Sequence, residues 1–197
     1  MKSTGILLFV MVTGSLVFGC AEMPRESILA ARSAIENAEK AQAAVYMEPE
    51  FKGLKDSLRA VMQDLEVENS KIIKDFSALK VRLEGIVTQT RKITAAVPAR
   101  REEVETESRL MIGKIRERLE TSRALLAKSP ETKEYGRGLD HIENELDSIV
   151  SNVTRIETSL QENVNYAEVL DELNAEHRFL IDINTELTEA LARGGRR

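Results

Sequence analysis

The chain has 197 residues, of which 42% are hydrophobic, 31% are charged and only 4% are aromatic, and it contains no tryptophan. This composition is typical of long helices in narrow bundles or coiled coils, and it argues against an enzyme with a compact aromatic core. The net charge is −5, and acidic and basic residues are interleaved along the chain, which argues against nucleic acid as a partner. We therefore expect an all-α protein made of elongated antiparallel helical hairpins or a coiled-coil bundle.

The first 19 residues are typical of a secretory signal peptide. Lys2 supplies a positive charge, residues 5–18 form an apolar stretch, and Gly19 is small. The apolar stretch is shorter than the roughly 20 residues that a membrane-spanning helix needs. We expect residues 1–19 to be removed. An ordinary signal peptide followed by an incidental cysteine, or an uncleaved anchor, are the alternatives.

Cys20 is the only cysteine of the chain, so neither an intramolecular disulfide nor a thiolate metal cluster can form. Residues 17–20, Val-Phe-Gly-Cys, resemble the lipobox of bacterial lipoproteins, although Phe18 departs from the small or threonine-like residue usual at its position. The resemblance implies cleavage between Gly19 and Cys20, and acylation of the thiol and of the new amino group. Because each buried methylene contributes about 0.8 kcal/mol, two or three acyl chains would anchor the protein stably.

The residue after the cysteine bears on which membrane carries the protein. Ala21 stands where an aspartate would resemble the inner-membrane retention signal of enteric bacteria. We therefore expect a lipid anchor in the outer membrane, with the protein facing the periplasm, rather than in the inner membrane.

Prolines divide the rest of the chain, because proline is costly inside a helix and suits its first turn. The expected helices cover residues 25–47, 50–97, 99–128 and 131–192. We expect residues 20–24 to be the lipidated N-terminus, 25–97 a helical hairpin, 98–192 a second hairpin, and 193–197 a flexible basic tail. Pro98 is either a turn or a kink. A shift of 81 residues places Pro49-Glu50-Phe51-Lys52 on Pro130-Glu131-Thr132-Lys133, which is either a true duplication or a chance alignment of heptads.

The second expected helix carries a coiled-coil pattern, in which every seventh residue is apolar. These residues are Phe51, Leu58, Leu65, Ile72, Leu79, Ile86 and Ile93. The repeat predicts left-handed supercoiling against a neighbouring helix. Asn69 falls at a core position of this repeat, where it either fixes the coiled-coil register through a buried amide or marks a locally open point. In the last expected helix the apolar stripe shifts near Asn163, which suggests that the packing partner changes or ends there.

Residues 31–58 resemble a family of uncharacterised helical-hairpin domains found in bacterial envelope lipoproteins. The sequence reads Ala-Arg-Ser-Ala-Ile-Glu-Asn-Ala at 31–38, followed by Tyr46, a turn with Pro49, and leucines at positions 54 and 58. The resemblance implies a helical hairpin in an envelope protein, and it carries no known catalytic residue.

The sequence indicates no catalytic, cofactor or metal site. His141 and His177 are the only histidines, and on one helix they would lie about 54 Å apart, too far to share a metal. Four glutamates at 102, 103, 105 and 107 have arginines beside them, which predicts a solvated charged face.

These observations favour a membrane-anchored periplasmic lipoprotein that acts as a structural or interaction module, not an enzyme. We expect it to serve as a tether, spacer or assembly partner. Its partners would be the lipid bilayer, through acylated Cys20, and another protein or a second copy, through the coiled-coil faces; no small-molecule substrate is evident. One alternative is an accessory subunit of an envelope transport or secretion complex that docks through an unpaired helix at about 163–192. Another is a ligand-sensing helical bundle.

Overall fold

The computed structural model describes residues 22–129, 136–160 and 165–194. Within these ranges the protein forms six helices and no strand, so the expected all-α fold is confirmed. The helices are α1 (Arg25–Lys40), α2 (Ala43–Tyr46), α3 (Glu48–Ser70), α4 (Ser77–Leu126), α5 (Gly136–Ser159) and α6 (Tyr166–Gly194).

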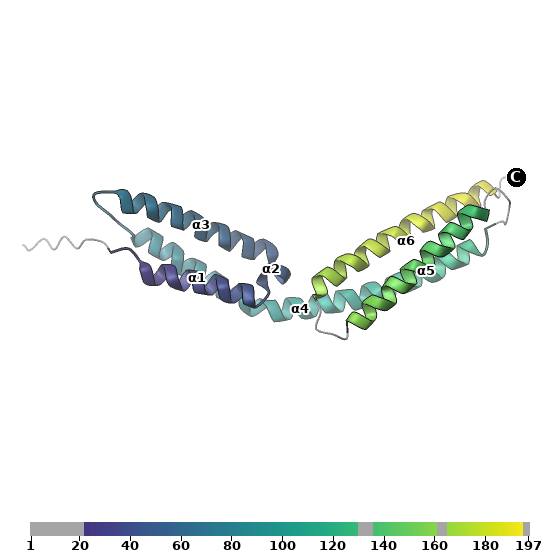
Figure 1. Ribbon diagram of the computed structural model, residues 1–197, viewed down its shortest axis with the longest axis horizontal. Coiled ribbons are helices and arrows are strands. Elements are labelled where there is room, and N and C mark those ends of the chain that lie inside the picture. The colour runs from purple at the N-terminus through teal and green to yellow at the C-terminus, as the bar shows by residue number, and fades with distance from the viewer. Residues whose placement is uncertain (1–21, 130–135, 161–164, 195–197) are drawn as a thin grey trace, which may run out of the picture.

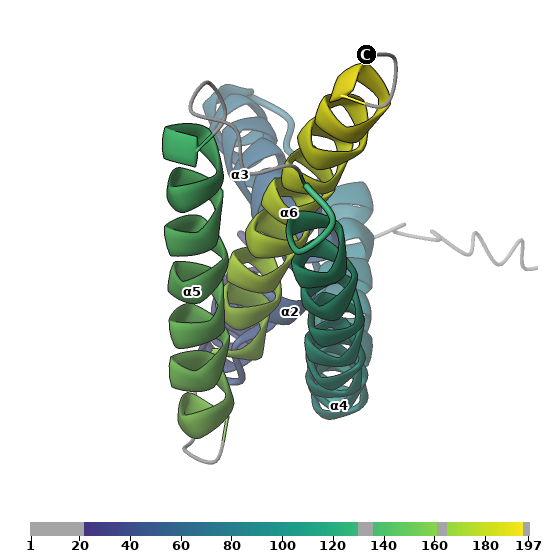
Figure 2. The same ribbon diagram turned by 90° about the vertical axis from the view of Figure 1, so that its right-hand side faces the viewer.

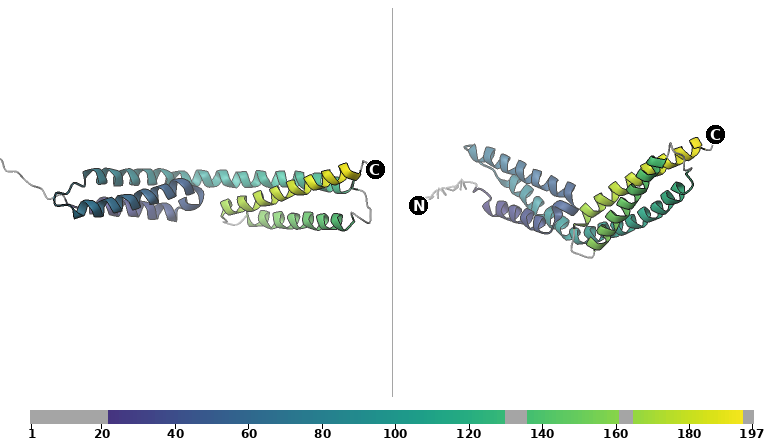
Figure 3. Two further views of the ribbon diagram at one scale, coloured as in Figure 1. Left: turned by 90° about the horizontal axis from the view of Figure 1, so that it is seen from above. Right: turned by 45° about the vertical axis from the view of Figure 1, so that its right-hand side comes forward.

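The 50-residue helix α4 runs along the whole molecule and holds its two halves together. Helices α1 and α3 pack on the first half of α4, whereas α5 and α6 pack on its second half (Figure 1). Seen from the distal end, α4 and α5 stand nearly upright and α6 runs obliquely from between them (Figure 2). The rod is bent in one plane, because it looks straight from above and angled from the side (Figure 3).

The core is a thin line of apolar side chains along α4, with one change in its spacing. Buried positions recur every three, four or seven residues along the helix, as one face of a helix requires. They are Leu79, Leu83, Ile86, Thr90, Val97, Val104, Ser108, Ile112, Ile115, Leu119 and Ser122. Two steps of four in succession, from Val104 through Ser108 to Ile112, break the alternation of a heptad repeat and shift the stripe around the helix. The shift lies just beyond the level at which α2 ends and α6 begins.

The expected helix over 50–97 is wrong, because the chain turns at residues 71–76. Helix α3 ends at Ser70 and α4 begins at Ser77. Ile72, expected in the coiled-coil seam, is fully exposed in this turn, at 101% of its reference area. The heptad repeat predicts a single helix, but the structure has two antiparallel neighbouring helices, α3 and α4.

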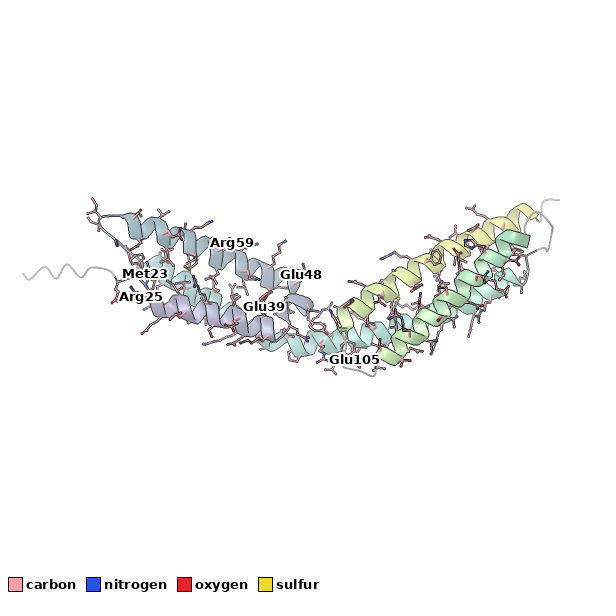
Figure 4. The ribbon with its side chains drawn as sticks, viewed as in Figure 1. Met23, Arg25, Glu39, Glu48, Arg59 and Glu105 are labelled. Carbon is pink, nitrogen blue, oxygen red and sulfur yellow. The ribbon has the colours of Figure 1, made fainter. Side chains whose placement is uncertain are left out.

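Pro98 does not end a helix, because it lies inside α4. The expected boundary between residues 97 and 98 consequently falls within one continuous helix. Proline has no N–H, so the hydrogen bond that would reach the carbonyl of Thr94 is missing, and such a gap is a known cause of helix kinks. The bend of the rod lies in this part of α4, close to the labelled Glu105 (Figure 4).

The last expected helix, over 131–192, divides into α5, which ends at Ser159, and α6, which begins at Tyr166. The shift of the apolar stripe near Asn163 therefore marked a reversal of the chain. Under the 81-residue shift, the exposed Ile72 corresponds to the buried Val153, and the 71–76 turn corresponds to residues 152–157 in the last part of α5. The two segments differ in backbone structure there, and Pro130 lies outside the described residues. Among the described helices, none is long and apolar enough to cross a membrane.

Candidate functional site

The first described residues place the N-terminal segment at one end of the rod. Gly19 and Cys20 lie outside the described residues. Met23 and Arg25 lie at the end of the rod that also carries the turn between α3 and α4 (Figure 4). Because a chain spans at most about 3.6 Å per residue, Cys20 lies within about 11 Å of Met23. Whatever Cys20 carries is therefore held near this end.

The turn at residues 71–76, called here the α3–α4 loop, is held by hydrogen bonds from both of its sides. The Glu68 carboxylate accepts one from Lys71 Nζ at 2.6 Å and one from the Asp75 backbone N–H at 2.9 Å. Asp75 Oδ1 in turn accepts the Ser77 backbone N–H at 2.9 Å, which satisfies a free donor at the start of α4. The hydrogen bond from Lys71 and then that from Asp75 lower the pKa of Glu68.

The α3–α4 loop turns its two isoleucines to solvent. Ile72 and Ile73 are 101% and 87% exposed, whereas Phe76 at the end of the loop is buried in the core. Asn69 is exposed in the last turn of α3, and its Oδ1 accepts a hydrogen bond from Lys74 Nζ at 3.0 Å. Within this chain Asn69 is therefore exposed rather than buried, and its role in coiled-coil register stays a prediction.

The two halves of the rod meet at a pair of buried tyrosines. Tyr46, the last residue of α2, accepts at its hydroxyl oxygen a 3.3 Å hydrogen bond from the backbone N–H of Tyr166, the first residue of α6. The guanidinium of Arg101 lies over the Tyr166 ring, 5.2 Å from its centroid, a distance typical of a cation–π contact. Asn165 Oδ1 accepts the next two N–H groups of α6 at 3.2 and 3.4 Å. This junction joins segments 120 residues apart in the sequence.

The glutamates of α4 near the bend form ion pairs with arginines of the same helix. Arg100 Nη1 lies 3.1 Å from Glu103 and 3.3 Å from Glu107, and Arg109 Nη2 lies 2.8 Å from Glu105. All of these pairs are on the surface, as expected for a solvated charged face. In the described residues, no group of three His, Cys, Asp or Glu side chains is placed to hold a metal ion.

The two histidines lie on different helices, so the separation expected along one helix does not apply. His141 on α5 is largely exposed and lies 3.3 Å from Glu145. His177 on α6 lines a shallow groove of about 340 Å³ together with Lys114 and Arg118 of α4. Burial lowers the pKa of His177, and the positive charges of Arg118 and Lys114 add to this effect.

Among the described residues, every buried side-chain oxygen or nitrogen has a hydrogen-bond partner. Thr90, Ser108 and Ser122, the buried polar residues of α4, each bond to the carbonyl four residues earlier. The α3–α4 loop is the feature that sequence reasoning missed; the adjacent isoleucines and the capping Asp75 ahead of Ser77 were its signals. Comparison with protein-family models, curated protein sequences and solved structures finds no match for this chain.

Proposed function

We propose that this protein is a lipoprotein of the cell envelope that works as a tether or spacer, anchored at Cys20 and extending away from the membrane. The observation that carries the proposal is the position of α1 relative to α4. The first described residues lie at one end of a 50-residue helix, which at 1.5 Å per residue is about 75 Å long. An anchor at Cys20 would thus leave the far end of the rod free to meet a partner.

The surface supports an interaction or spacing role. Ion pairs bridge neighbouring helices along the distal half, including Arg123 with Asp147 at 2.9 Å and Arg155 with Glu172 at 2.9 Å. Such exposed pairs contribute little stability each, about 0–1 kcal/mol, and they keep the surface polar. Most large apolar side chains are buried, so the described surface of the rod exposes them only at the α3–α4 loop and as scattered single side chains.

The fold gives no support to docking on a larger complex through a free distal helix. Helix α6 packs along α4, and Leu173, Leu180 and Leu187 are completely buried. The helix expected to be unpaired at about 163–192 therefore already has a partner within the chain.

The anchor is tested by a pair of substitutions in the full-length chain. Cys20→Ala should abolish acylation and release the protein from the membrane fraction, as read by intact mass and by fractionation. Ala21→Asp should keep the acyl chains but move the protein toward the inner membrane on a density gradient. If Cys20→Ala remains in the membrane with its signal segment uncleaved, the apolar stretch is the anchor and the proposed lipidation is wrong.

The spacer role is tested by the distance of the far end from the bilayer. A dye on a cysteine placed at Asp140, which is exposed on α5 beyond the bend, should stay out of range of quenchers in the lipid headgroups. The same dye on a cysteine placed at Lys71, in the α3–α4 loop, should be quenched. Equal quenching at both positions would mean that the rod lies flat on the membrane, and the spacer role would be excluded.

A further inference from the structure

We propose that Ile72 and Ile73 of the α3–α4 loop insert into the same bilayer that holds the acyl chains of Cys20, giving the protein a second membrane contact. The inference rests on the proposed lipid anchor. Three features of the described residues carry it: the exposure of the isoleucines, the hydrogen bonds that flank them, and the end of the rod at which they lie.

The exposure of the two isoleucines is unusual for this molecule. Both side chains are almost fully in water, at 101% and 87%, although the neighbouring Phe76 is buried in the same loop. Each isoleucine has apolar surface whose transfer out of water is favourable, and none of the described residues covers it.

Hydrogen bonds flank the two isoleucines on both sides of the loop. Glu68 binds Lys71 before the isoleucines and Asp75 after them, and Lys74 is bound to Asn69. Of these bonds, the one from the Asp75 N–H holds the loop backbone, and the Lys71 N–H adds a second by donating to the Glu68 carbonyl at 3.2 Å. These two backbone bonds flank Ile72 and Ile73 and favour the outward-facing loop in the free protein.

The position of the loop indicates that the bilayer is the surface that its isoleucines contact. The α3–α4 loop and the start of α1 share one end of the rod (Figure 1), and Cys20 lies within about 11 Å of Met23. Acyl chains on Cys20 would bring this end, rather than any other surface, to the lipid. A second contact beside the first would set the direction in which the rod leaves the membrane.

The charges of the loop indicate which lipids matter. Lys71 is paired with Glu68 of α3, and Asp75 offsets Lys74, so the loop and Glu68 together have no net charge. Insertion should therefore depend on the isoleucines and change little between neutral phosphatidylcholine and vesicles that contain phosphatidylglycerol. Loss of one isoleucine should weaken the contribution of the loop to partitioning by about tenfold.

The absence of tryptophan from the sequence allows a direct test. In the acylated full chain, Ile72→Trp creates a single fluorophore in the loop, and Leu110→Trp creates a matched control at a 63% exposed site on α4. In phosphatidylcholine vesicles, we expect the loop variant to emit at shorter wavelength and to be quenched by brominated lipid. The control should emit as in water and stay unquenched.

The outcomes separate the loop from the anchor. Intact mass reports acylation independently, so an unacylated mature protein refutes the proposed anchor and the loop contact that rests on it. An acylated protein whose loop fluorophore remains unquenched refutes the loop contact alone. If the double substitution Ile72→Ser/Ile73→Ser instead abolishes self-association in sedimentation equilibrium without vesicles, the isoleucines face a second copy of the chain and the bilayer proposal is overturned.

Discussion

Substitution of Tyr46 by phenylalanine tests whether the tyrosine junction couples the two halves of the rod. The hydroxyl oxygen accepts the N–H of Tyr166, which as the first residue of a helix has no partner within it. The N–O distance of 3.3 Å is slightly longer than the usual range, so the bond itself is weak. Leaving a buried donor unpaired costs about 1–3 kcal/mol, and for this long bond we expect the lower end, about 1 kcal/mol.

The loss should appear in two measurements. Urea denaturation followed by circular dichroism should show a fall of about 1 kcal/mol in the free energy of unfolding, or a melting temperature lower by about 2–4 °C for a chain of this size. Native-state hydrogen exchange should show the loss of protection concentrated in the first turn of α6 rather than in α5.

Removal of an exposed hydroxyl provides the control for the junction. Thr106 lies on α4 close to the junction, and its hydroxyl bonds to the carbonyl of Glu102 on the exposed face. Thr106→Val should change stability by less than about 0.5 kcal/mol. Tyr46→Ala, which also removes the buried ring, should cost about 3–5 kcal/mol. If Tyr46→Phe is as stable as the unmodified protein, the hydrogen bond does not couple the halves and the reasoning is refuted.

Three further predictions address the connecting turn, the bend and the histidine groove. Gln42 has a left-handed backbone, with φ of 67°, so Gln42→Gly should stabilise the protein by about 0.5–1 kcal/mol in urea denaturation, and an unchanged midpoint would contradict this. The exposed Pro98 removes one hydrogen bond from inside α4. Pro98→Ala should therefore raise the unfolding free energy by about 1–3 kcal/mol and lengthen the rod in small-angle scattering. A less stable, equally bent variant would refute the attribution of the bend to Pro98. The lowered pKa of His177 means that this side chain binds a proton more readily in the unfolded chain than in the folded protein. Stability should therefore fall as the pH drops through about 6.5, and His177→Gln should reduce that fall when melting temperatures are measured across this pH range. An equal dependence of melting temperature on pH in the variant and the unmodified protein would contradict this.

The helical nature of the chain could be predicted from sequence because heptad spacing and helix-forming residues agree along nearly its whole length. The turn at 71–76 could not be predicted from that pattern, since seven residues separate Leu65 from Ile72 and Ile72 from Leu79 whether the chain continues or reverses. The reversal instead depends on Glu68 and Asp75, whose local hydrogen bonds carry no periodicity. Ile72 was therefore assigned to a core that does not contain it.

Proline was a poor guide to the boundary at Pro98 because its cost inside a helix is finite. A loss of about 3 kcal/mol is offset when both flanking segments bury apolar side chains, and Val97 and Val104 are buried on either side. Pro49 behaves as expected and lies in the first turn of α3, where no helical partner is lost. The same residue type thus starts one helix and bends another, and the packing of its neighbours decides between the two outcomes.

The continuity of α4 links the two ends of the molecule mechanically. Its core stripe shifts between Val104 and Ile112 without any break in the helix, so the change of packing partners adds no flexible connection. The Tyr46 hydroxyl also joins the first turn of α6 to the N-terminal half through one weak hydrogen bond. Because helix and junction both cross the bend, an orientation imposed at the α3–α4 loop would be transmitted to the distal end. A second membrane contact at Ile72 and Ile73 would therefore aim the whole rod, which acyl chains on a short N-terminal segment could not do alone.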